Sequence, residues 1–480
     1  MEGLEGQGDA MAQIKLTGRV VYPGDFGWDD ARKGFNQRFD VQPKAVVFCQ
    51  NARDVANAVL WARENGVPFR ARSGRHSYEG YSLVQDGLVI DLSDLDNVSV
   101  NREQRIAQIG AGIHMLELSE WLGQVNVTIP LATGPTVGLA GLTLGGGFGL
   151  TSRKYGLTCD NLIGLELVDA EGRVRIASEF RHPDLFWACK GGGGGNFGIV
   201  TRFFFRVHPV SFAVAFMAQW DWSQFEAVVA AWQDWAWGVD NDVSTALQLT
   251  VTKTVKLYGL YTPDDPADLP KAQQLLAPLL QAVPPPSLPG NPTVQPLPFN
   301  VATRLFYGEG GKTVNPEDPV WDVIVHDDQQ IYKSTSAAAL EPFSAEAIGI
   351  LKHYLENVPP LEQPPVQPSM VQLLGGGGRA AQTDPASSAV HLRQARFIVQ
   401  YDGFWAADAD GQETIDWIRD FRNALLPHTA GAYVNYVDSN IPDPLQAYYG
   451  PNLPRLVEVK RKYDPHNVFN FPQSIPVSLP

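Results

Sequence analysis

The sequence predicts an α+β fold with two domains, and three observations lead to this prediction. The chain has 480 residues, which is more than a single hydrophobic core usually organises. Short strands and helices alternate over the first 210 residues. From about Ser211, strand-like segments alternate with amphipathic helices. From about Ala432, the composition is again rich in aromatic residues, Asn and Asp, as in the first part of the chain.

A β-α-β unit is predicted near the start of the chain. Residues 45–49 form a short apolar run that is typical of a buried strand. Asn51 is the expected N-cap of the following helix, whose apolar residues recur at i, i+3, i+4 and i+7: Val55, Ala58, Val59 and Ala62. Asn65-Gly66 ends this helix, and residues 67–73 are predicted as the next strand. This strand leads directly into the loop that contains His76.

The same patterns predict the remaining elements. Strands are expected at residues 88–92, 105–110, 165–170, 173–177, 198–207, 245–255 and 396–401. Helices are expected at residues 115–122, 183–190, 268–282 and 412–425. Two proline-rich stretches, residues 284–298 and 359–368, are predicted to be extended connections at the surface.

Charge and cysteine content exclude several classes of protein. The net charge of −15 repels phosphate backbones and anionic membranes, so neither nucleic acid nor a membrane is an expected partner. No stretch reaches the roughly 18 consecutive apolar residues of a membrane span, and residues 1–18 do not resemble a signal peptide. The chain has three cysteines, Cys49, Cys159 and Cys189. Their number is odd and no two of them are close in the sequence, which disfavours a disulfide framework or a metal site. We therefore expect a cytoplasmic protein that binds no metal.

Glycine is concentrated in three clusters, at residues 74–80, 134–149 and 191–198. Glycine lets backbone N–H groups approach an anion closely, so converging loops of this kind suit a pyrophosphate and a flat ring. Flexible linkers are the alternative, but these clusters contain aromatic and β-branched residues and almost no serine. Gly193, Gly195 and Gly198 match the dinucleotide fingerprint G-x-G-x-x-G, which must follow a strand and open a helix. Here a helix is predicted before it and a strand after it, so a Rossmann NAD site is disfavoured.

The residues around these clusters resemble the berberine-bridge-enzyme-like FAD-linked oxidases of the vanillyl-alcohol-oxidase superfamily. The resemblance rests on blocks that follow one another in the family's order and spacing: Arg72-Ser73-Gly74-Arg75-His76-Ser77-Tyr78-Glu79-Gly80, Gly145-Gly146-Gly147-Phe148-Gly149, Arg153-Lys154-Tyr155-Gly156-Leu157 with Asp160-Asn161, Gly194-Gly195-Asn196-Phe197-Gly198, Tyr433-Val434-Asn435-Tyr436, Tyr463-Asp464-Pro465 and Phe471-Pro472-Gln473. It implies an FAD-binding domain of two subdomains, formed by residues 1–210 and 425–480. It also implies a substrate domain, residues 211–424, with a mostly antiparallel sheet flanked by helices.

The resemblance implies that FAD is joined covalently to His76. The other residues expected to contact the cofactor are Arg72, Ser73, Gly74, Arg75, Ser77, Gly80, Gly134, Thr136, Val137, Gly138, Gly141, Gly145, Asp160, Asn161, Gly198, Ile199, Val200, Tyr433 and Asn435. Many relatives form a second covalent bond from a cysteine at the position of Gly134, so a single bond is expected here. Arg75 stands where the family usually has glycine, which predicts a differently shaped pyrophosphate loop. Val137 matches the position that controls oxygen access to the flavin, where the resemblance implies that a valine admits oxygen; a valine that only packs in the core is the alternative.

The expected reaction is the oxidation of an alcohol-type small molecule, which requires a group that takes the hydroxyl proton. Tyr436 matches a tyrosine that the family places at the flavin, and Tyr78 and Gln400 match other pocket positions; packing alone is the alternative for each. A phenol has a pKa near 10, so Tyr436 as a base needs a nearby cation, for which Arg393 and Arg396 are candidates.

The resemblance implies that hydride passes to FAD and then to O2, giving hydrogen peroxide. A sugar, an aromatic alcohol or a natural-product intermediate is the expected substrate. A dehydrogenase with another electron acceptor and a non-enzymatic flavin-binding protein remain alternatives, and the sequence does not determine the oligomeric state.

Overall fold

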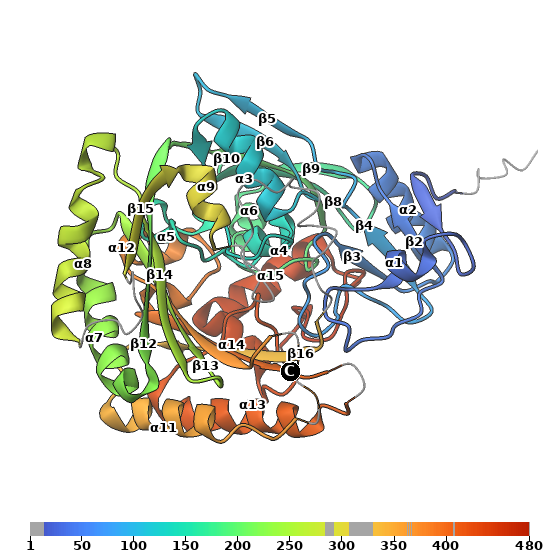
Figure 1. The fold of residues 1–480 in the computed structure, drawn as a ribbon. Coiled ribbons are helices and arrows are strands. Elements are labelled where there is room, and N and C mark those ends of the chain that lie inside the picture. Colours follow the sequence, from blue (N-terminus) through green and yellow to red (C-terminus); the bar gives the residue numbers. More distant parts are fainter. Residues whose placement is uncertain are drawn as a thin grey trace, which may run out of the picture.

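The computed structural model describes residues 14–283, 292–306, 330–361, 363, 365, 367–406 and 409–479. The described chain combines helices with several mostly antiparallel sheets, which confirms the predicted α+β class (Figure 1). None of the helices within these ranges is long and apolar enough to cross a bilayer.

The first sheet holds the loop that contains His76. Its strand order is β1-β2-β4-β3, with β1 (Arg19–Val21), β2 (Ala45–Phe48), β3 (Phe69–Arg72) and β4 (Leu88–Asp91). Helix α2 (Ala52–Glu64) connects β2 to β3, and the side chain of Asn51 accepts hydrogen bonds from the first-turn N–H groups of Arg53 and Asp54. The predicted β-α-β unit is therefore confirmed, although β4 pairs in parallel with both strands and lies between them.

The second sheet is antiparallel throughout and has the order β5-β6-β10-β8-β9. Its strands are β5 (Val98–Asn101), β6 (Ile106–Gly110), β8 (Leu162–Val168), β9 (Val174–Ala177) and β10 (Ile199–Arg206). Helix α6 (Pro183–Ala188) precedes the third glycine cluster and β10 follows it. This is the reverse of the dinucleotide-binding order, as predicted.

Both sheets contribute to one large hydrophobic core, which the end of the chain joins. Helix α15 (Leu453–Tyr463) contributes Leu456 and Val459 to it, and Ile475 lies in it close to the C-terminus. The shorter elements of this part are β7 (Val127–Thr128), β11 (His208–Pro209), α1 (Trp28–Arg32), α3 (Met115–Gln124), α4 (Leu139–Leu144), α5 (Ser152–Tyr155) and α14 (Pro444–Tyr449).

The third sheet has seven strands, and every neighbouring pair is antiparallel. Its order is β15 (Thr293–Pro298), β12 (Phe212–Asp221), β14 (Thr254–Tyr261), β13 (Val243–Thr250), β17 (Met370–Gly375), β18 (Phe397–Phe404) and β16 (Tyr332–Ala339). One face of this sheet shares a hydrophobic core with the helices α7 (Phe225–Gly238), α8 (Lys271–Ala282), α11 (Ala345–Glu356) and α13 (Gln412–Leu425). Figure 1 shows these helices on the outer side of the sheet. Two short helices, α9 (Phe299–Arg304) and α12 (Gly378–Gln382), complete this part.

The alternation of side chains along these strands gives the sheet one apolar and one partly polar face. On β18, Val399 and Tyr401 lie in the core beneath the helices. Gln400 and Asp402 line the cavity on the opposite face. The sheet therefore brings polar side chains from several strands to one wall of the cavity.

Two predictions about this region are wrong. Residues 245–255 are not one strand, because β13 ends at Thr250 and β14 begins at Thr254, with a turn between them in which Lys253 has a φ of +63°. Part of the first proline-rich stretch forms the edge strand β15 rather than a surface connection. An edge strand tolerates proline because one of its sides needs no N–H donors. Residues 284–291 of that stretch lie outside the described residues.

Candidate active site

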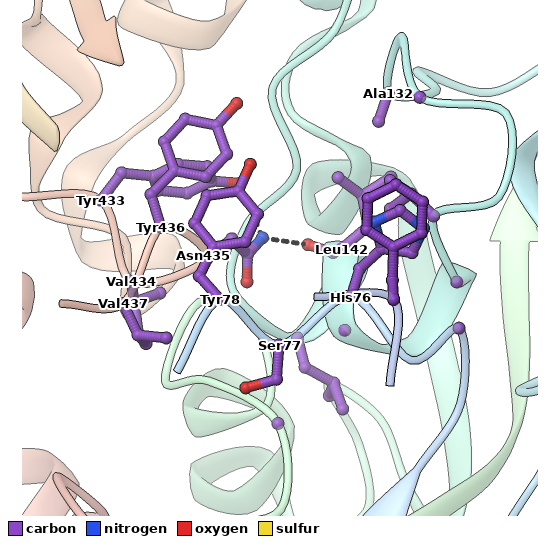
Figure 2. Close-up of a pocket in the computed structure, with 18 of the residues that line it drawn as sticks. His76, Ser77, Tyr78, Ala132, Leu142, Tyr433, Val434, Asn435, Tyr436 and Val437 are labelled. Carbon is purple, nitrogen blue, oxygen red and sulfur yellow. Dashed lines mark hydrogen bonds between the residues drawn. The ribbon is translucent and has the colours of Figure 1, made fainter. Parts of the chain in front are cut away.

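A cavity of about 520 Å³ lies between the glycine-rich loops and the polar face of the seven-stranded sheet. Most of the residues predicted from the sequence line it: Arg72, Ser73, Gly74, Arg75, His76, Ser77, Tyr78, Gly134, Val137, Gly138, Gly141, Gly198, Ile199, Val200, Gln400, Tyr433, Asn435 and Tyr436. Figure 2 shows Tyr78, Tyr433 and Tyr436 gathered on one side of the cavity, with His76 on the other. Residues that are distant in the sequence thus surround one space.

Three of the predicted residues lie behind the cavity wall. The hydroxyl group of Thr136 forms a hydrogen bond with the His76 Nε2, but Thr136 is not one of the residues that line the cavity. Gly145 permits the close approach of Asn435, because a Cβ at this glycine would lie 1.9 Å from the Asn435 Oδ1. Gly80 packs against Phe39, and its φ of +65° favours glycine. These residues shape the wall without facing the space inside it.

Asp160 and Asn161 also lie outside the cavity lining, and their side chains have structural partners. Arg393 donates a hydrogen bond from Nη1 to Asp160 Oδ2 over 2.8 Å, within a largely buried ion pair. The side-chain amide of Asn161 donates to the carbonyl of Leu157 over 2.9 Å. These contacts connect segments of the fold, and the structure provides no contact of either residue with the cavity.

The loop that follows β3 is anchored at its start and takes an unusual backbone path. The guanidinium of Arg72 is buried, pairs with Asp91 and donates to the carbonyl of Lys33 over 3.1 Å. Arg75 has a φ of +65°, in the left-handed region that favours glycine. The arginine therefore adopts the kind of conformation expected of the family's glycine at this position, while its Nη1 donates to the carbonyl of Asp30.

The backbone of this loop fits the pyrophosphate part of FAD. The N–H groups of Gly74, Arg75, His76 and Ser77 have no hydrogen-bond acceptor within the ranges that the structure describes. Consecutive N–H groups of this kind form an anion-binding nest. A Cβ on Gly74 would lie 2.1 Å from the backbone nitrogen of Gly138, so the two loops pack together only as glycine against glycine.

The wall beyond these loops fits the flat ring of the cofactor. Gly141 borders open space, since a Cβ there would meet no atom within 4 Å. Val137 and Gly134 line the same cavity. Cys49, Cys159 and Cys189 are free and buried, and none of them is part of the cavity lining. No cysteine of the described chain therefore takes the place of the missing residue at Gly134.

His76 is held in one orientation by two contacts. Its imidazole stacks on Phe35, with ring centroids 4.0 Å apart, and its Nε2 lies 2.7 Å from the Thr136 hydroxyl oxygen. Burial, with a smaller contribution from the charge of His114, lowers the pKa of His76 to about 3. The imidazole is therefore neutral at physiological pH, which is the form that acts as a nucleophile.

The sheet side of the cavity contains a hydrogen-bonded group of polar side chains. The Gln400 amide donates to Tyr78 Oη over 3.2 Å and to Asp402 Oδ1 over 3.1 Å. Ser334 also donates to Asp402 Oδ1, whereas Asp402 Oδ2 is buried without a partner among the described residues. The ring of Tyr78 stacks on that of Tyr436, with centroids 5.3 Å apart and planes at 7°.

Asp402 is a candidate functional residue that was not predicted from the sequence. Its side chain is 2% exposed, and burial raises its pKa to about 6. Strongly perturbed carboxyl groups in cavities are typical of functional sites. One signal was present in the sequence, because residues i and i+2 of a strand share a face and Asp402 follows Gln400 at this spacing.

The two arginines expected beside Tyr436 lie elsewhere, so that prediction is wrong. Arg393 pairs with Asp160, and Arg396 lies over the ring of Trp237; neither arginine lines the cavity. Burial raises the pKa of Tyr436 well above its ordinary value, and the neighbouring Tyr433 and the charge of Asp402 raise it further. Tyr436 is therefore a neutral phenol at physiological pH.

Comparison with known proteins relates the whole chain to FAD-linked enzymes. Residues 43–178 match the FAD binding domain family, and residues 432–476 match the family described as berberine and berberine like. The FAD-linked oxidoreductase YgaK of Bacillus subtilis is 38% identical over 473 residues, which cover 97% of this chain and 98% of that protein. A xylooligosaccharide oxidase of Thermothelomyces thermophilus is 29% identical over 467 residues, covering 93% of this chain and 90% of the oxidase.

The fold matches solved structures of the same group. Wild-type BBE-like 1 of Physcomitrella patens superimposes with a TM-score of 0.86 at 30% identity, covering 97% of this chain and 98% of the other. The agreement therefore includes the middle of the chain, where sequence motifs are weakest. The glycine-rich loops suit FAD, the seven-stranded sheet faces them, and the similarity extends over almost the full length of the chain. This chain is therefore an enzyme of the berberine-bridge-enzyme-like family of FAD-linked oxidoreductases.

Proposed function

We propose that this enzyme oxidises an alcohol group of a small molecule and passes the electrons to oxygen. The observation that carries the proposal is the buried carboxyl group of Asp402, which lies in the cavity with a pKa of about 6. Oxidation of an alcohol needs an acceptor for the hydroxyl proton, and a base with a pKa near the working pH is the most effective one. The similarity to a xylooligosaccharide oxidase supports an alcohol-type substrate such as a sugar.

In this proposal Asp402 accepts the substrate proton, and Tyr436 and Tyr78 orient the substrate hydroxyl. Asp402 is mostly ionised above pH 6, whereas Tyr436 stays protonated. Gln400 and Ser334 both donate to Oδ1 of Asp402, which leaves Oδ2 without a protein partner among the described residues. Tyr436 is close enough to Asp402 for the carboxylate charge to raise the pKa of its phenol. A substrate hydroxyl held by Tyr436 would therefore lie near the carboxylate that accepts its proton.

The loop of His76 and the glycine-rich loops would hold the FAD, which accepts hydride from the substrate carbon when it is bound. The nest at residues 74–77 suits the pyrophosphate, and the neutral His76 suits covalent attachment. We propose attachment through His76 alone, because Gly134 replaces the family's second attachment residue. Val137 lines the cavity and supports oxygen as the electron acceptor.

Anaerobic mixing of the purified holoenzyme with sugars, aromatic alcohols and amines tests the proposed reaction. An active alcohol should bleach the flavin absorbance, and admission of air should restore it with formation of one hydrogen peroxide per turnover. Bleaching by amines alone would contradict alcohol oxidation. Bleached flavin that reoxidises with a quinone but not with air would contradict oxygen as the acceptor.

A further inference from the structure

A straight row of polar side chains crosses the cavity wall. Gln400, Gln372, Gln248 and Lys256 are register partners on four neighbouring strands, β18, β17, β13 and β14. All four line the cavity. Neighbouring strands are roughly 4.8 Å apart, so three intervals place Lys256 roughly 14 Å from Gln400.

The two middle members of the row are amides with unused hydrogen-bonding capacity. Tyr258 donates from Oη to the Gln372 Oε1 over 2.8 Å, which fixes the amide and leaves its NH2 group available to a ligand. The Gln248 NH2 group donates to the Met370 sulfur, which is a weak acceptor, and the Oε1 of Gln248 remains available to a ligand. Donors and acceptors that alternate in this way suit a ligand with several hydroxyl groups.

Lys256 lines the cavity and has no counter-ion among the described residues. Lys154, Lys333 and Lys460 each pair with at least one carboxylate. Lys256 is half-buried and forms no salt bridge or hydrogen bond with the described residues. Burial lowers its pKa, and no neighbouring carboxylate contributes to the shift. Asp402 in the same cavity is therefore too distant to neutralise the ammonium group.

An uncompensated ammonium group in a cavity is unfavourable until a ligand neutralises it. The protein as a whole carries a net charge of −15, so a cation at this place does not reflect a generally basic surface. The row leads from Gln400, which bonds to both Tyr78 and Asp402, to this cation. A ligand that fills the row would be oxidised at one end and carry negative charge at the other.

We propose that the substrate is an acidic oligosaccharide whose carboxylate binds Lys256, whose intervening hydroxyls bond to Gln372 and Gln248, and whose oxidised carbon lies beside Asp402. This inference rests on the proposed alcohol oxidation and names its substrate class. One sugar ring is too short for the row, whereas two or three linked rings extend over it. A neutral oligosaccharide leaves the ammonium group unpaired, so the enzyme binds the acidic oligosaccharide in preference to the neutral one.

Binding to the holoenzyme tests this proposal without requiring turnover. The probes are cellobiose and cellobiouronic acid, which differ only in whether the terminal sugar carries a hydroxymethyl group or a carboxylate. Their Kd values are measured at pH 7 from the perturbation of the flavin spectrum. We expect the acid to bind at least tenfold more tightly than cellobiose. Equal affinities, tighter binding of cellobiose or no binding of either probe would overturn the proposal.

Three variants assign the preference to Lys256. Lys256→Met removes the charge at similar length and should bring the ratio of the two Kd values close to one. Lys256→Arg should retain the preference, which also controls for folding at this position. Lys253→Met changes the net charge equally at an exposed residue of the β13–β14 turn and should leave the ratio as in the parent. A preference that persists in Lys256→Met would overturn the assignment.

The same experiment separates this proposal from the proposed reaction. Charge-dependent binding without bleaching of the flavin by any alcohol would support the Lys256 site and contradict alcohol oxidation. Bleaching by neutral sugars without any preference for the acid would support alcohol oxidation and overturn the Lys256 proposal.

Discussion

The side-chain amide of Gln400 donates a hydrogen bond to Oδ1 of Asp402 over 3.1 Å. The two residues lie two positions apart on β18, so both face the cavity. The bond stabilises the ionised carboxylate, but burial outweighs it and keeps the pKa of Asp402 raised, at about 6. Gln400 thereby holds a carboxyl group that changes its protonation state near neutral pH.

We expect the rate of flavin reduction by an active substrate to rise with pH through about 6, because Asp402 must be ionised to accept a proton. Asp402→Asn should lower this rate by roughly 10²-fold or more at pH 7.5 and should remove the rise near pH 6. Anaerobic stopped-flow measurements across pH 5–8 test both expectations. An unchanged profile in the variant would exclude Asp402 as the base.

The same substitution should alter stability in a pH-dependent way. The pKa of Asp402 is raised from 3.8 to about 6 in the folded protein, so its protonated form is favoured there and stability is lost as pH rises through this interval. An asparagine side chain at this position does not ionise. We therefore expect Asp402→Asn to match the parent at pH 4 and to be more stable at pH 8, by up to about 3 kcal/mol. Denaturant unfolding at the two pH values measures the difference, and a variant that is less stable at pH 8 contradicts the expectation.

Tyr436→Phe should slow flavin reduction by roughly 10²-fold or more, because it removes the hydroxyl that orients the substrate. The phenylalanine ring preserves the stack on Tyr78, so folding and cofactor content should remain unchanged. Single-turnover reduction and substrate Kd are measured together. A rate within about threefold of the parent, less than about 1 kcal/mol on the barrier, would assign Tyr436 to packing alone.

Val137→Leu should slow reoxidation of reduced flavin by oxygen and leave reduction by substrate nearly unchanged. Val137 is half-buried in the cavity wall, and the extra methylene of leucine fills space beside it. Reduced enzyme is mixed with air-saturated buffer and the return of flavin absorbance is recorded. Equal rates in the two proteins would remove Val137 from the oxygen route.

Covalent attachment of FAD should depend on His76 and be assisted by Thr136. Acid-precipitated parent protein should remain yellow, whereas His76→Ala should release all of its FAD, since Gly134 offers no second attachment. Thr136→Val removes the hydroxyl 2.7 Å from the His76 Nε2 at nearly the same volume, and should slow attachment when FAD is added to apoprotein. Flavin mass on the peptide of residue 76 is followed with time. Covalent flavin in His76→Ala would contradict a single bond.

Much of this protein was determined by patterns local to the sequence. Asn51 caps α2 as predicted, and α13 covers residues 412–425 as predicted, because capping and helical periodicity depend on residues a few positions apart. The motif around His76 identified the family for the same reason, since its residues are consecutive. The break between β13 and β14 was missed because apolar and β-branched residues continue on both sides of the turn.

Tertiary structure alone decided the electrostatics of the site. Arg393 is close to Gln400 in sequence, yet it pairs with Asp160, 233 positions away, and never reaches Tyr436. Asp402 acquires its raised pKa, and Lys256 its place in a row with three glutamines, only when strands far apart in the chain come together. Burial and cross-strand register depend on what surrounds a side chain in space, and a linear pattern does not contain that information.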